Sequence, residues 1–164
     1  ENNVGTFERF FCKKEFKNIG LLSEIVQINR NFTKYAGTIR GLHFQHSPSA
    51  EEKVITCLKG SVYDVALDIR KDSPTFLQWH SEILSDSNGK CMYIPKGFAH
   101  GFLTLVDNCE ILYFHSEFYS EENEGAILYD DPRINIKWPI EIKHLSERDK
   151  KLLHLKQNFK GIVT

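Results

Sequence analysis

Short apolar stretches with strand character recur along the chain, separated by residues that favour turns. They are rich in β-branched and aromatic residues and cover residues 24–29, 53–58, 61–69, 91–95, 101–106 and 109–115. The turn signals between them include Lys59-Gly60, Ser87-Asn88-Gly89, Asp107-Asn108 and Asp131-Pro132. Strands spaced by turn signals in this way predict an antiparallel sandwich or barrel, so we expect a mostly β protein.

The stretch 61–69 shows the clearest alternation of side chains. Positions 63, 65, 67 and 69 share one uniformly apolar face, which we expect to pack against a core. The opposite face combines Asp64 and Asp68 with small apolar residues. A face of this kind is usually solvated, but in a small barrel the same alternation also lines an interior cavity. The pattern alone leaves both environments open for Asp64.

Two short helices are predicted, one towards each end of the chain. Residues 12–19 form the first, which ends near Gly20. Residues 147–156 form the second, because Ser146 is a good N-cap and three leucines are interleaved there with charged residues. The expected fold is therefore a β-structure with a few short helices, one of them at the C-terminus.

The composition is that of one ordinary globular domain, which we expect to span residues 1–164. The chain has 41% apolar residues and a net charge of -1. The apolar content excludes a disordered chain, and the balanced charge gives no electrostatic reason to expect nucleic acid or an anionic membrane as a partner. No apolar run reaches the roughly 18–20 residues that a membrane helix needs.

The cysteines point to a reducing compartment. Cys12, Cys57, Cys91 and Cys109 form no C-x-x-C pair and no Cys–His cluster with zinc spacing, so we interpret them as reduced thiols. No secretory signal is visible, and we expect a cytoplasmic protein. The chain opens at Glu1 rather than Met, so its natural start can lie further upstream.

Two segments carry histidines at strand positions. In the segment RGLHFQ at 40–45, strict alternation would put Arg40 and His43 on opposite faces, but a bulge at Gly41 would bring them together. In the segment PKGFAHGF at 95–102, Pro and Gly fix a turn that delivers His100 onto the next strand. A histidine in a strand is more often a hydrogen-bonded structural residue than a catalytic one, so neither segment is decisive alone.

The spacing P-x-G-x-x-H around His100 resembles the second half of the metal-binding signature of cupin barrels. The first half would need two closely spaced histidines and a glutamate. The only pair here is His43 and His46, on opposite faces of a regular strand, and no glutamate follows at the required spacing. A transition metal held mainly by imidazoles would lack ligands, so we expect no metal site.

Two further residues have both a structural and a chemical interpretation. Tyr113, with His115 two residues on and on the same face, is typical of a core tyrosine, but a phenol that faces a pocket can donate a proton. Asp149, three residues after Ser146, is typical of the first turn of a helix, where the macrodipole favours an acid.

Taken together, these segments resemble the dTDP-4-dehydrorhamnose 3,5-epimerase family along nearly the whole chain. Each motif is weak alone, but their order and spacing are highly specific. The matching stretches are RGLHFQ at 40–45, Lys53-Val54, VYDVALDIRKDSPTF at 62–76, IPKGFAHGF at 94–102, Tyr113, DDPRINIKWP at 130–139 and LSERD at 145–149.

The resemblance implies a cupin-type antiparallel β-barrel, or jelly roll, that needs no metal or cofactor and forms a homodimer. It implies that His43 is the catalytic base, Asp149 its carboxylate partner, Lys53 the cation at the keto oxygen and Tyr113 the proton donor on the opposite face of the sugar. Asp64 matches a polar residue of the inner cavity. The positions that match or are candidates for contacts with sugar, phosphates or nucleotide are Gln27, Asn29, Arg40, His100, Tyr119 and Arg148.

These roles are chemically consistent with one another. A 4-keto sugar has acidic C–H bonds at C3 and C5, because each carbanion delocalises onto the ketone oxygen. A neutral histidine held by a carboxylate can remove such a proton near pH 7, and an ammonium group would stabilise the enolate. The implied function is inversion of C3, C5 or both in a nucleotide-linked 4-keto-6-deoxy sugar, with dTDP as the expected nucleotide.

The chain departs from the family near its start. The family shows D-x-R-G-x-F where this chain reads Asn2-Asn3-Val4-Gly5-Thr6-Phe7, so an arginine expected to reach the nucleotide is Val4. Arg9 is the candidate to replace it. Asn31 stands at the position of a small hydroxyl residue, and Phe114 at the position of a lysine. The chemistry is therefore better defined than the substrate.

Three other functions stay open at this point. A 3,4-ketoisomerase on the same barrel would also begin by deprotonating C3, but would return the proton to a different atom. A cupin that binds a sugar nucleotide without catalysis would explain the altered nucleotide residues. A metal-dependent cupin oxygenase is the third alternative.

Overall fold

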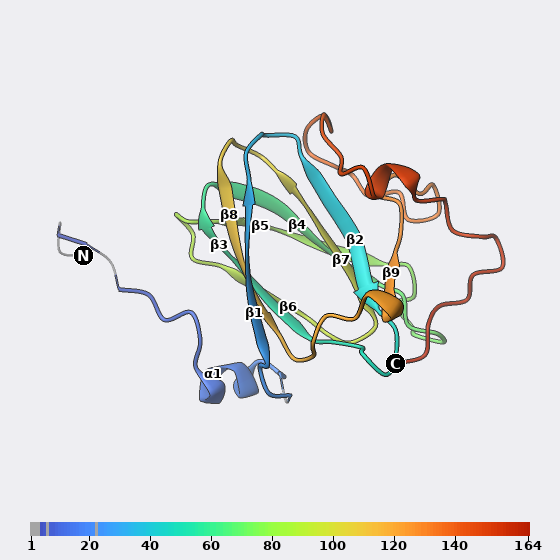
Figure 1. The fold of residues 1–164 in the computed structure, drawn as a ribbon, viewed down its shortest axis with the longest axis horizontal. Coiled ribbons are helices and arrows are strands. Elements are labelled where there is room, and N and C mark those ends of the chain that lie inside the picture. The colour runs from blue at the N-terminus through green and yellow to red at the C-terminus, as the bar shows by residue number, and fades with distance from the viewer. Residues whose placement is uncertain (1–3, 6, 22) are drawn as a thin grey trace.

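Two antiparallel sheets face each other in the computed structural model, which describes residues 4–5, 7–21 and 23–164 (Figure 1). One sheet has the strand order β1 (Gln27–Thr33), β8 (Cys109–His115), β3 (Lys53–Lys59) and β6 (Cys91–Ile94). The other has the order β5 (Trp79–Ser85), β4 (Ser61–Asp68), β7 (Phe98–Thr104), β2 (Ile39–Gln45) and β9 (Glu124–Ala126). The expectation of a jelly-roll barrel of the cupin type is confirmed.

The predicted apolar stretches all fall on strands, but two of them are displaced. The stretch 101–106 begins and ends too late, because β7 runs from Phe98 to Thr104. The stretch 24–29 is only partly correct, because β1 begins at Gln27 and runs on to Thr33. Its bounds are set by the pairing with β8, from Gln27 opposite His115 to Thr33 opposite Cys109, and not by its own apolar residues. Two strands, β5 and β9, were not predicted.

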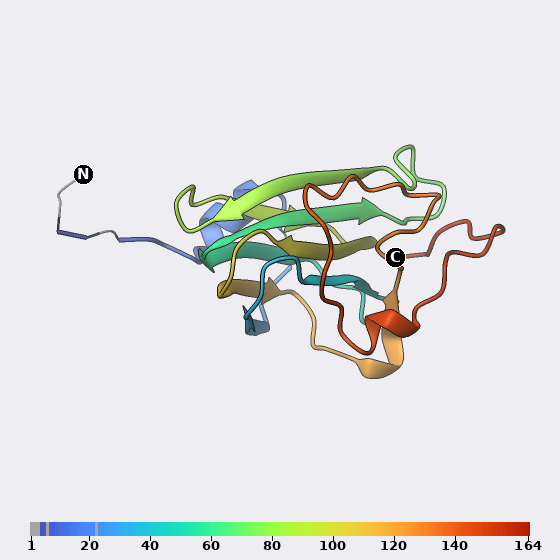
Figure 2. The same ribbon diagram turned by 90° about the horizontal axis from the view of Figure 1, so that it is seen from above.

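Both faces of β4 are buried, each against a different layer. One face packs between the sheets, where residues such as Val62, Ala66 and Phe102 form the interior core. The other face carries Val65 and Leu67, which pack under the C-terminal segment that crosses the outside of the second sheet (Figure 2). Asp64 is fully buried on the interior face, so the cavity interpretation of the alternation is the correct one.

The helix predicted at 12–19 is present as α1 (Lys13–Asn18), but the one predicted at 147–156 is wrong. Only the 3₁₀ turn η2 (Asp149–Lys151) forms there, and a second one, η1 (Glu121–Asn123), precedes β9. Leu152 is extended, and the backbone N–H of Leu155 donates to Asp131 Oδ2 at 2.5 Å. Tertiary contacts of this irregular segment replace the helix. No helix among the described residues is long and apolar enough to cross a membrane.

Two glycines allow β2 and β7 to approach closely where the predicted bulge occurs. A Cβ at Gly41 would lie 2.5 Å from the carbonyl oxygen of His100, and one at Gly101 would lie 2.6 Å from that of Arg40. Gly41 also has a φ of +103°, which disfavours other residues. The register between β2 and β7 shifts between Arg40 and His43, which then pairs with His100. The bulge therefore turns Arg40 and His43 toward the same cavity, as predicted.

Candidate active site

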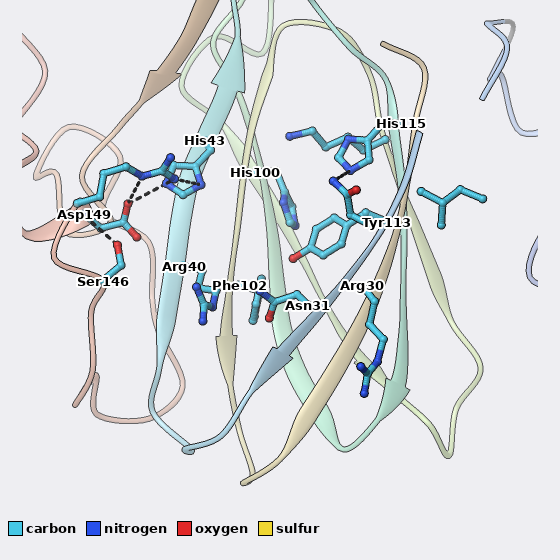
Figure 3. A pocket seen from close by; sticks show the side chains of 14 residues that line it. Arg30, Asn31, Arg40, His43, His100, Phe102, Tyr113, His115, Ser146 and Asp149 are labelled. Atoms are coloured by element: carbon cyan, nitrogen blue, oxygen red, sulfur yellow. Dashed lines mark hydrogen bonds and ion pairs between the residues drawn. The ribbon is translucent and has the colours of Figure 1, made fainter. Parts of the chain in front are cut away.

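A cavity of about 720 Å³ opens between the two sheets (Figure 3). It brings together eight of the residues predicted from the sequence, namely Asn29, Arg40, His43, Lys53, His100, Tyr113, Arg148 and Asp149. Two groups of side chains face each other across it. We call His43, Arg148 and Asp149 the β2 wall, and Lys53, Tyr113 and His115 the β8 wall.

The β2 wall is organised around a histidine–carboxylate pair. His43 Nε2 donates to Asp149 Oδ1 at 2.8 Å, and the Asp149 side chain is only 2% exposed. Burial raises the pKa of Asp149, but the hydrogen bonds from His43 and Ser146 and the charge of Arg148 outweigh it, so its pKa lies below the ordinary carboxyl value. Asp149 is therefore a carboxylate at neutral pH, and it bonds only one of the two ring nitrogens of His43.

The Ser146 side chain bonds to the backbone of Asp149. The N–H of Asp149 donates to Ser146 Oγ at 3.0 Å, while the Asp149 side chain points to His43. Asp149 therefore lies in a 3₁₀ turn and not in the predicted helix, and its side chain is directed at the imidazole of His43.

Arg148 lies directly over the imidazole of His43. One guanidinium nitrogen is 2.7 Å from His43 Nε2 and 3.2 Å from Nδ1, while another donates to Glu124 Oε2 at 2.7 Å. The guanidinium is half exposed, so it can reach an anionic group bound at the mouth of the cavity.

The floor of the cavity holds a second histidine–carboxylate pair. His100 Nε2 donates to Asp64 Oδ1 at 2.8 Å, and both side chains are buried. Among the described residues, Asp64 Oδ2 is the buried side-chain polar atom without a hydrogen-bond partner. Burial and the charge of Asp64 raise the pKa of Tyr113, so its phenol stays protonated at neutral pH.

The β8 wall contains a third pair, which the sequence did not predict. Glu51 Oε2 accepts from His115 Nδ1 at 2.7 Å, and Glu51 Oε1 pairs with Lys53 Nζ at 2.9 Å. Burial raises the pKa of Glu51, but His115 and Lys53 outweigh it, so the pKa lies below its ordinary value. The position of His115 two residues after Tyr113 was the only signal in the sequence for this pair.

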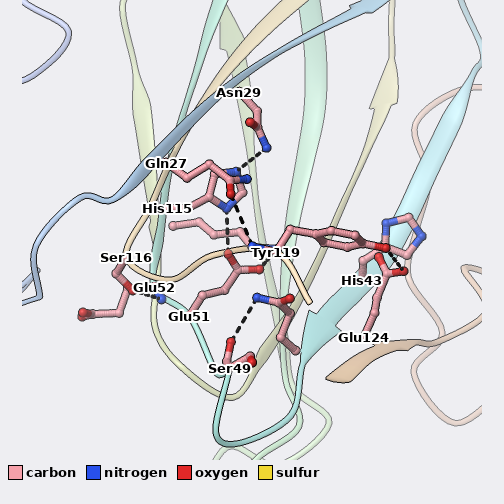
Figure 4. A network of polar contacts seen from close by, with 12 residues as sticks. Gln27, Asn29, His43, Ser49, Glu51, Glu52, His115, Ser116, Tyr119 and Glu124 are labelled. Carbon is pink, nitrogen blue, oxygen red and sulfur yellow. Dashed lines mark hydrogen bonds and ion pairs between the residues drawn. The ribbon is translucent and has the colours of Figure 1, made fainter. Parts of the chain in front are cut away.

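A smaller hollow of about 150 Å³ adjoins the main cavity and holds two of the three remaining predicted residues, and the third, Asp64, is buried behind His100 (Figure 4). Gln27 and Tyr119 line it, and the backbone N–H of Tyr119 donates to Gln27 Oε1 at 3.3 Å. The Tyr119 hydroxyl donates to Glu124 Oε2 at 3.2 Å. The two hollows share Asn29, His43, Lys53 and His115 and are therefore continuous.

The residues that depart from the family pattern lie mostly at the periphery. Val4 is exposed on a segment that leads away from the barrel, and Arg9 pairs with Glu15 at the surface (Figure 1). Asn2, Asn3 and Thr6 of the same motif fall outside the described residues. Phe114 is buried under α1 on the outer face of its sheet, so it takes no part in the cavity.

The four cysteines are free, and Cys57 and Cys109 are buried as their apolar surroundings predict. Within residues 4–5, 7–21 and 23–164, no group of three or more histidine, cysteine, aspartate or glutamate side chains is arranged to hold a metal ion. The fold and the cavity side chains together define a cupin-type barrel whose site is suited to acid–base chemistry.

Comparisons with known proteins agree with this class. The family model for dTDP-4-dehydrorhamnose 3,5-epimerase matches residues 1–157, and the chain therefore belongs to this family of isomerases. The dTDP-4-dehydrorhamnose 3,5-epimerase of Shigella flexneri is 44% identical over 146 residues, which cover 88% of this chain and 80% of that protein.

Solved structures show the same similarity. The dTDP-4-dehydrorhamnose 3,5-epimerase of Bacillus anthracis, with TDP and PPi bound, is 42% identical and covers 94% of this chain and 89% of its own, with a TM-score of 0.90. A 3,5-epimerase from Legionella pneumophila in complex with dTDP-4-keto-L-rhamnose is 38% identical, covers 92% of this chain and 80% of its own, and has a TM-score of 0.86.

Proposed function

We propose that this chain inverts C3, C5 or both in a dTDP-linked 4-keto-6-deoxy sugar, through an enolate and without a redox cofactor or metal. The observation that carries the proposal is the arrangement of His43 and Asp149 on one wall of the cavity, with Lys53 and Tyr113 on the wall opposite. Abstraction on one face of a sugar ring and protonation on the other is the geometry that inversion requires.

His43 is the proposed base. Its Nδ1, which is not bonded to Asp149, takes the proton from the carbon next to the ketone once Arg148 has turned to the substrate, and the electron pair of the C–H bond moves onto the ketone oxygen to form an enolate. The Asp149 carboxylate fixes the orientation of the ring and stabilises the imidazolium that results. His43 then loses the proton to solvent, which the partial exposure of its side chain permits.

Lys53 is the proposed partner of the enolate oxygen. Its ammonium group lies in the cavity with the side chain only 12% exposed, so little water screens its charge. A positive charge preorganised in such a site stabilises a developing oxyanion more strongly than it would in water.

Tyr113 is the proposed proton donor. Its phenol stays protonated because its pKa is raised, and its hydroxyl points into the cavity (Figure 3). It gives its proton to the carbon from the face opposite His43, and the phenolate then regains a proton from water. His100 lines the cavity beside it and is assigned to the sugar, while Asp64 is fully buried behind His100 and acts through it.

The remaining predicted residues are assigned to the nucleotide and its phosphates. Arg40 and Arg148 supply positive charge for a diphosphate, and Asn29, Gln27 and Tyr119 supply polar contacts. The TDP and dTDP-4-keto-L-rhamnose named for the two solved relatives support dTDP as the nucleotide.

We also infer that the chain works as one domain in a homodimer in the cytoplasm. β1 is the edge strand of its sheet and exposes Ile28 and Phe32, which supports a second copy as its partner. Free cysteines support a reducing compartment. Light scattering on the wild type and on Phe32→Glu would test the dimer, which the variant should weaken.

Deuterium exchange tests the proposed reaction. In D2O with dTDP-4-keto-6-deoxyglucose, proton NMR should show deuterium entering at each carbon that is inverted. A carbonyl that moves to C3 would identify a 3,4-ketoisomerase instead. Binding without exchange, for this and for other 4-keto nucleotide sugars, would favour the non-catalytic alternative and contradict the proposal.

A further inference from the structure

We propose that Glu51 is a positioning residue that holds the Lys53 ammonium at the reacting carbonyl, with His115 as the second anchor of its carboxylate. The inference rests on the proposed function, because the role of Lys53 beside an enolate belongs to that function. Glu51 itself lines the smaller hollow and not the main cavity, so it acts through Lys53.

The Glu51 carboxylate divides its two oxygens between the two partners. Oε1 pairs with Lys53 Nζ at 2.9 Å. Oε2 accepts from His115 Nδ1 at 2.7 Å, and Figure 4 shows this contact. The Glu51 side chain is 7% exposed and that of His115 is 11% exposed. A carboxylate bound on both sides and shielded from water cannot rotate without breaking one of two charge-assisted contacts.

The strand register makes this arrangement rigid. Lys53 on β3 and His115 on β8 are direct antiparallel partners, and His115 in turn pairs with Gln27 on β1. Asn29, also on β1, donates to His115 Nε2 at 3.4 Å. Three adjacent strands therefore fix the imidazole, the imidazole fixes Glu51, and Glu51 fixes the ammonium.

A lysine at this place needs such an anchor more than most residues do. Its ammonium sits on a flexible four-carbon stem, so ordering that side chain costs more rotamer entropy than ordering a short or rigid one. Among the described residues, Glu51 is the carboxylate that pairs with Lys53. An ammonium held before the substrate arrives need not be ordered during the reaction.

The contact between Glu51 and Lys53 also has an electrostatic effect that works against the benefit of positioning. The Glu51 carboxylate partly cancels the positive charge that Lys53 offers to the enolate, and His115 draws off part of that negative charge by hydrogen bonding. Neutralising Glu51 therefore removes the anchor but also unmasks the ammonium. If positioning is the larger effect, Glu51→Gln lowers kcat; if charge cancellation is larger, it raises kcat.

Glu51→Gln is therefore the first test, with Glu52→Gln as its matched control. Glu52 is the next residue and is also shielded from solvent, but its carboxylate accepts from the hydroxyl of Tyr93 and does not line the cavity. We expect kcat of Glu51→Gln to fall by about 10- to 100-fold with little change in KM, since small misplacements of a catalytic group cost rates of this order. Glu52→Gln should keep kcat within about 2-fold. An unchanged or higher kcat in Glu51→Gln would overturn the proposal.

A double-mutant cycle separates positioning from a general structural role. In a Lys53→Met background, Glu51→Gln should cause almost no further loss of deuterium exchange, because there is no ammonium left to position. Exchange measured over long incubations keeps these slow variants measurable. Equal losses in both backgrounds would mean that Glu51 acts independently of Lys53.

A third measurement needs no substrate. In the folded protein, the side-chain ammonium of Lys53 should give a protected 1H–15N signal, assigned by its absence in Lys53→Met. The signal should persist in Glu52→Gln and disappear in Glu51→Gln. Its absence from the wild type, or its persistence in Glu51→Gln, would refute the anchor. If the anchor is seen but no 4-keto nucleotide sugar undergoes exchange, only the proposed function fails.

Discussion

The two walls of the cavity use the same pair of residue types in different ways. On the β2 wall, His43 keeps part of its ring open to the cavity, and its carboxylate partner comes from an irregular segment 106 residues further along the chain. On the β8 wall, His115 and Glu51 are both largely buried, and the carboxylate has a second partner in Lys53. A histidine–carboxylate pair is thus not a function in itself: its exposure and its third partner decide whether it can exchange protons or only hold another group in place.

The largest difference between the walls should appear when each histidine is replaced by asparagine. His43→Asn is expected to lower deuterium exchange at both carbons by about 10³-fold, since it removes the base. His115→Asn should lower it by about 10-fold or less, because the anchor is weakened but the reacting groups remain. Proton NMR in D2O measures both. Equal losses would show that the two pairs do not differ in role.

A smaller effect should separate abstraction from protonation. Tyr113→Phe removes the proposed donor but leaves His43 and Lys53 in place, so net inversion should fall by about 100-fold while exchange at the first carbon is reduced less. The ratio of exchanged to inverted product, followed by NMR, is the measurement. If exchange and inversion fall together, the donor is a different group.

The smallest effect concerns stability in acid. The pKa of Asp149 and that of Glu51 are both lowered in the folded protein, so near pH 4 the unfolded chain binds more protons than the folded one. The resulting stabilisation is complete above the unfolded carboxyl pKa of about 4 and is lost as pH falls through the lowered folded values.

Melting temperatures between pH 3 and pH 6 test this dependence. Asp149→Asn and Glu51→Gln should each flatten the loss of stability in acid, with Glu52→Gln as the reference for a buried glutamate nearby. A curve for Glu51→Gln that parallels the wild type would mean that folding does not lower the pKa of Glu51.

Much of the barrel could be predicted because alternation and turn residues act locally. The stretch 61–69 predicts a strand with two different faces, and both are buried in the structure. The bulge at Gly41 could also be anticipated. A regular strand puts the side chains of Arg40 and His43 on opposite faces, and a bulge at the glycine between them puts both on the same face. The residues of the family motifs then meet around one cavity.

The remainder depended on contacts between distant residues. The leucines of 147–156 predict a helix. Instead, Leu155 packs on the outer core and its backbone N–H donates to Asp131, and no local pattern reveals these contacts. Glu51 stands in a polar run before β3 and looks like a solvated residue. Only the register of β3 on β8 brings it to His115, so the pair could be found only in three dimensions.

The two members of the acid–base pair come from different parts of the fold. The imidazole belongs to a strand, whereas its carboxylate is delivered by chain that wraps the outside of the sheets after they are complete (Figure 2). All nine strands that the structure describes precede Ser146, so removal of the chain from Ser146 onward would take away the carboxylate of the acid–base pair together with part of the cover over β4. The reactivity of the site therefore depends on a segment that belongs to neither sheet.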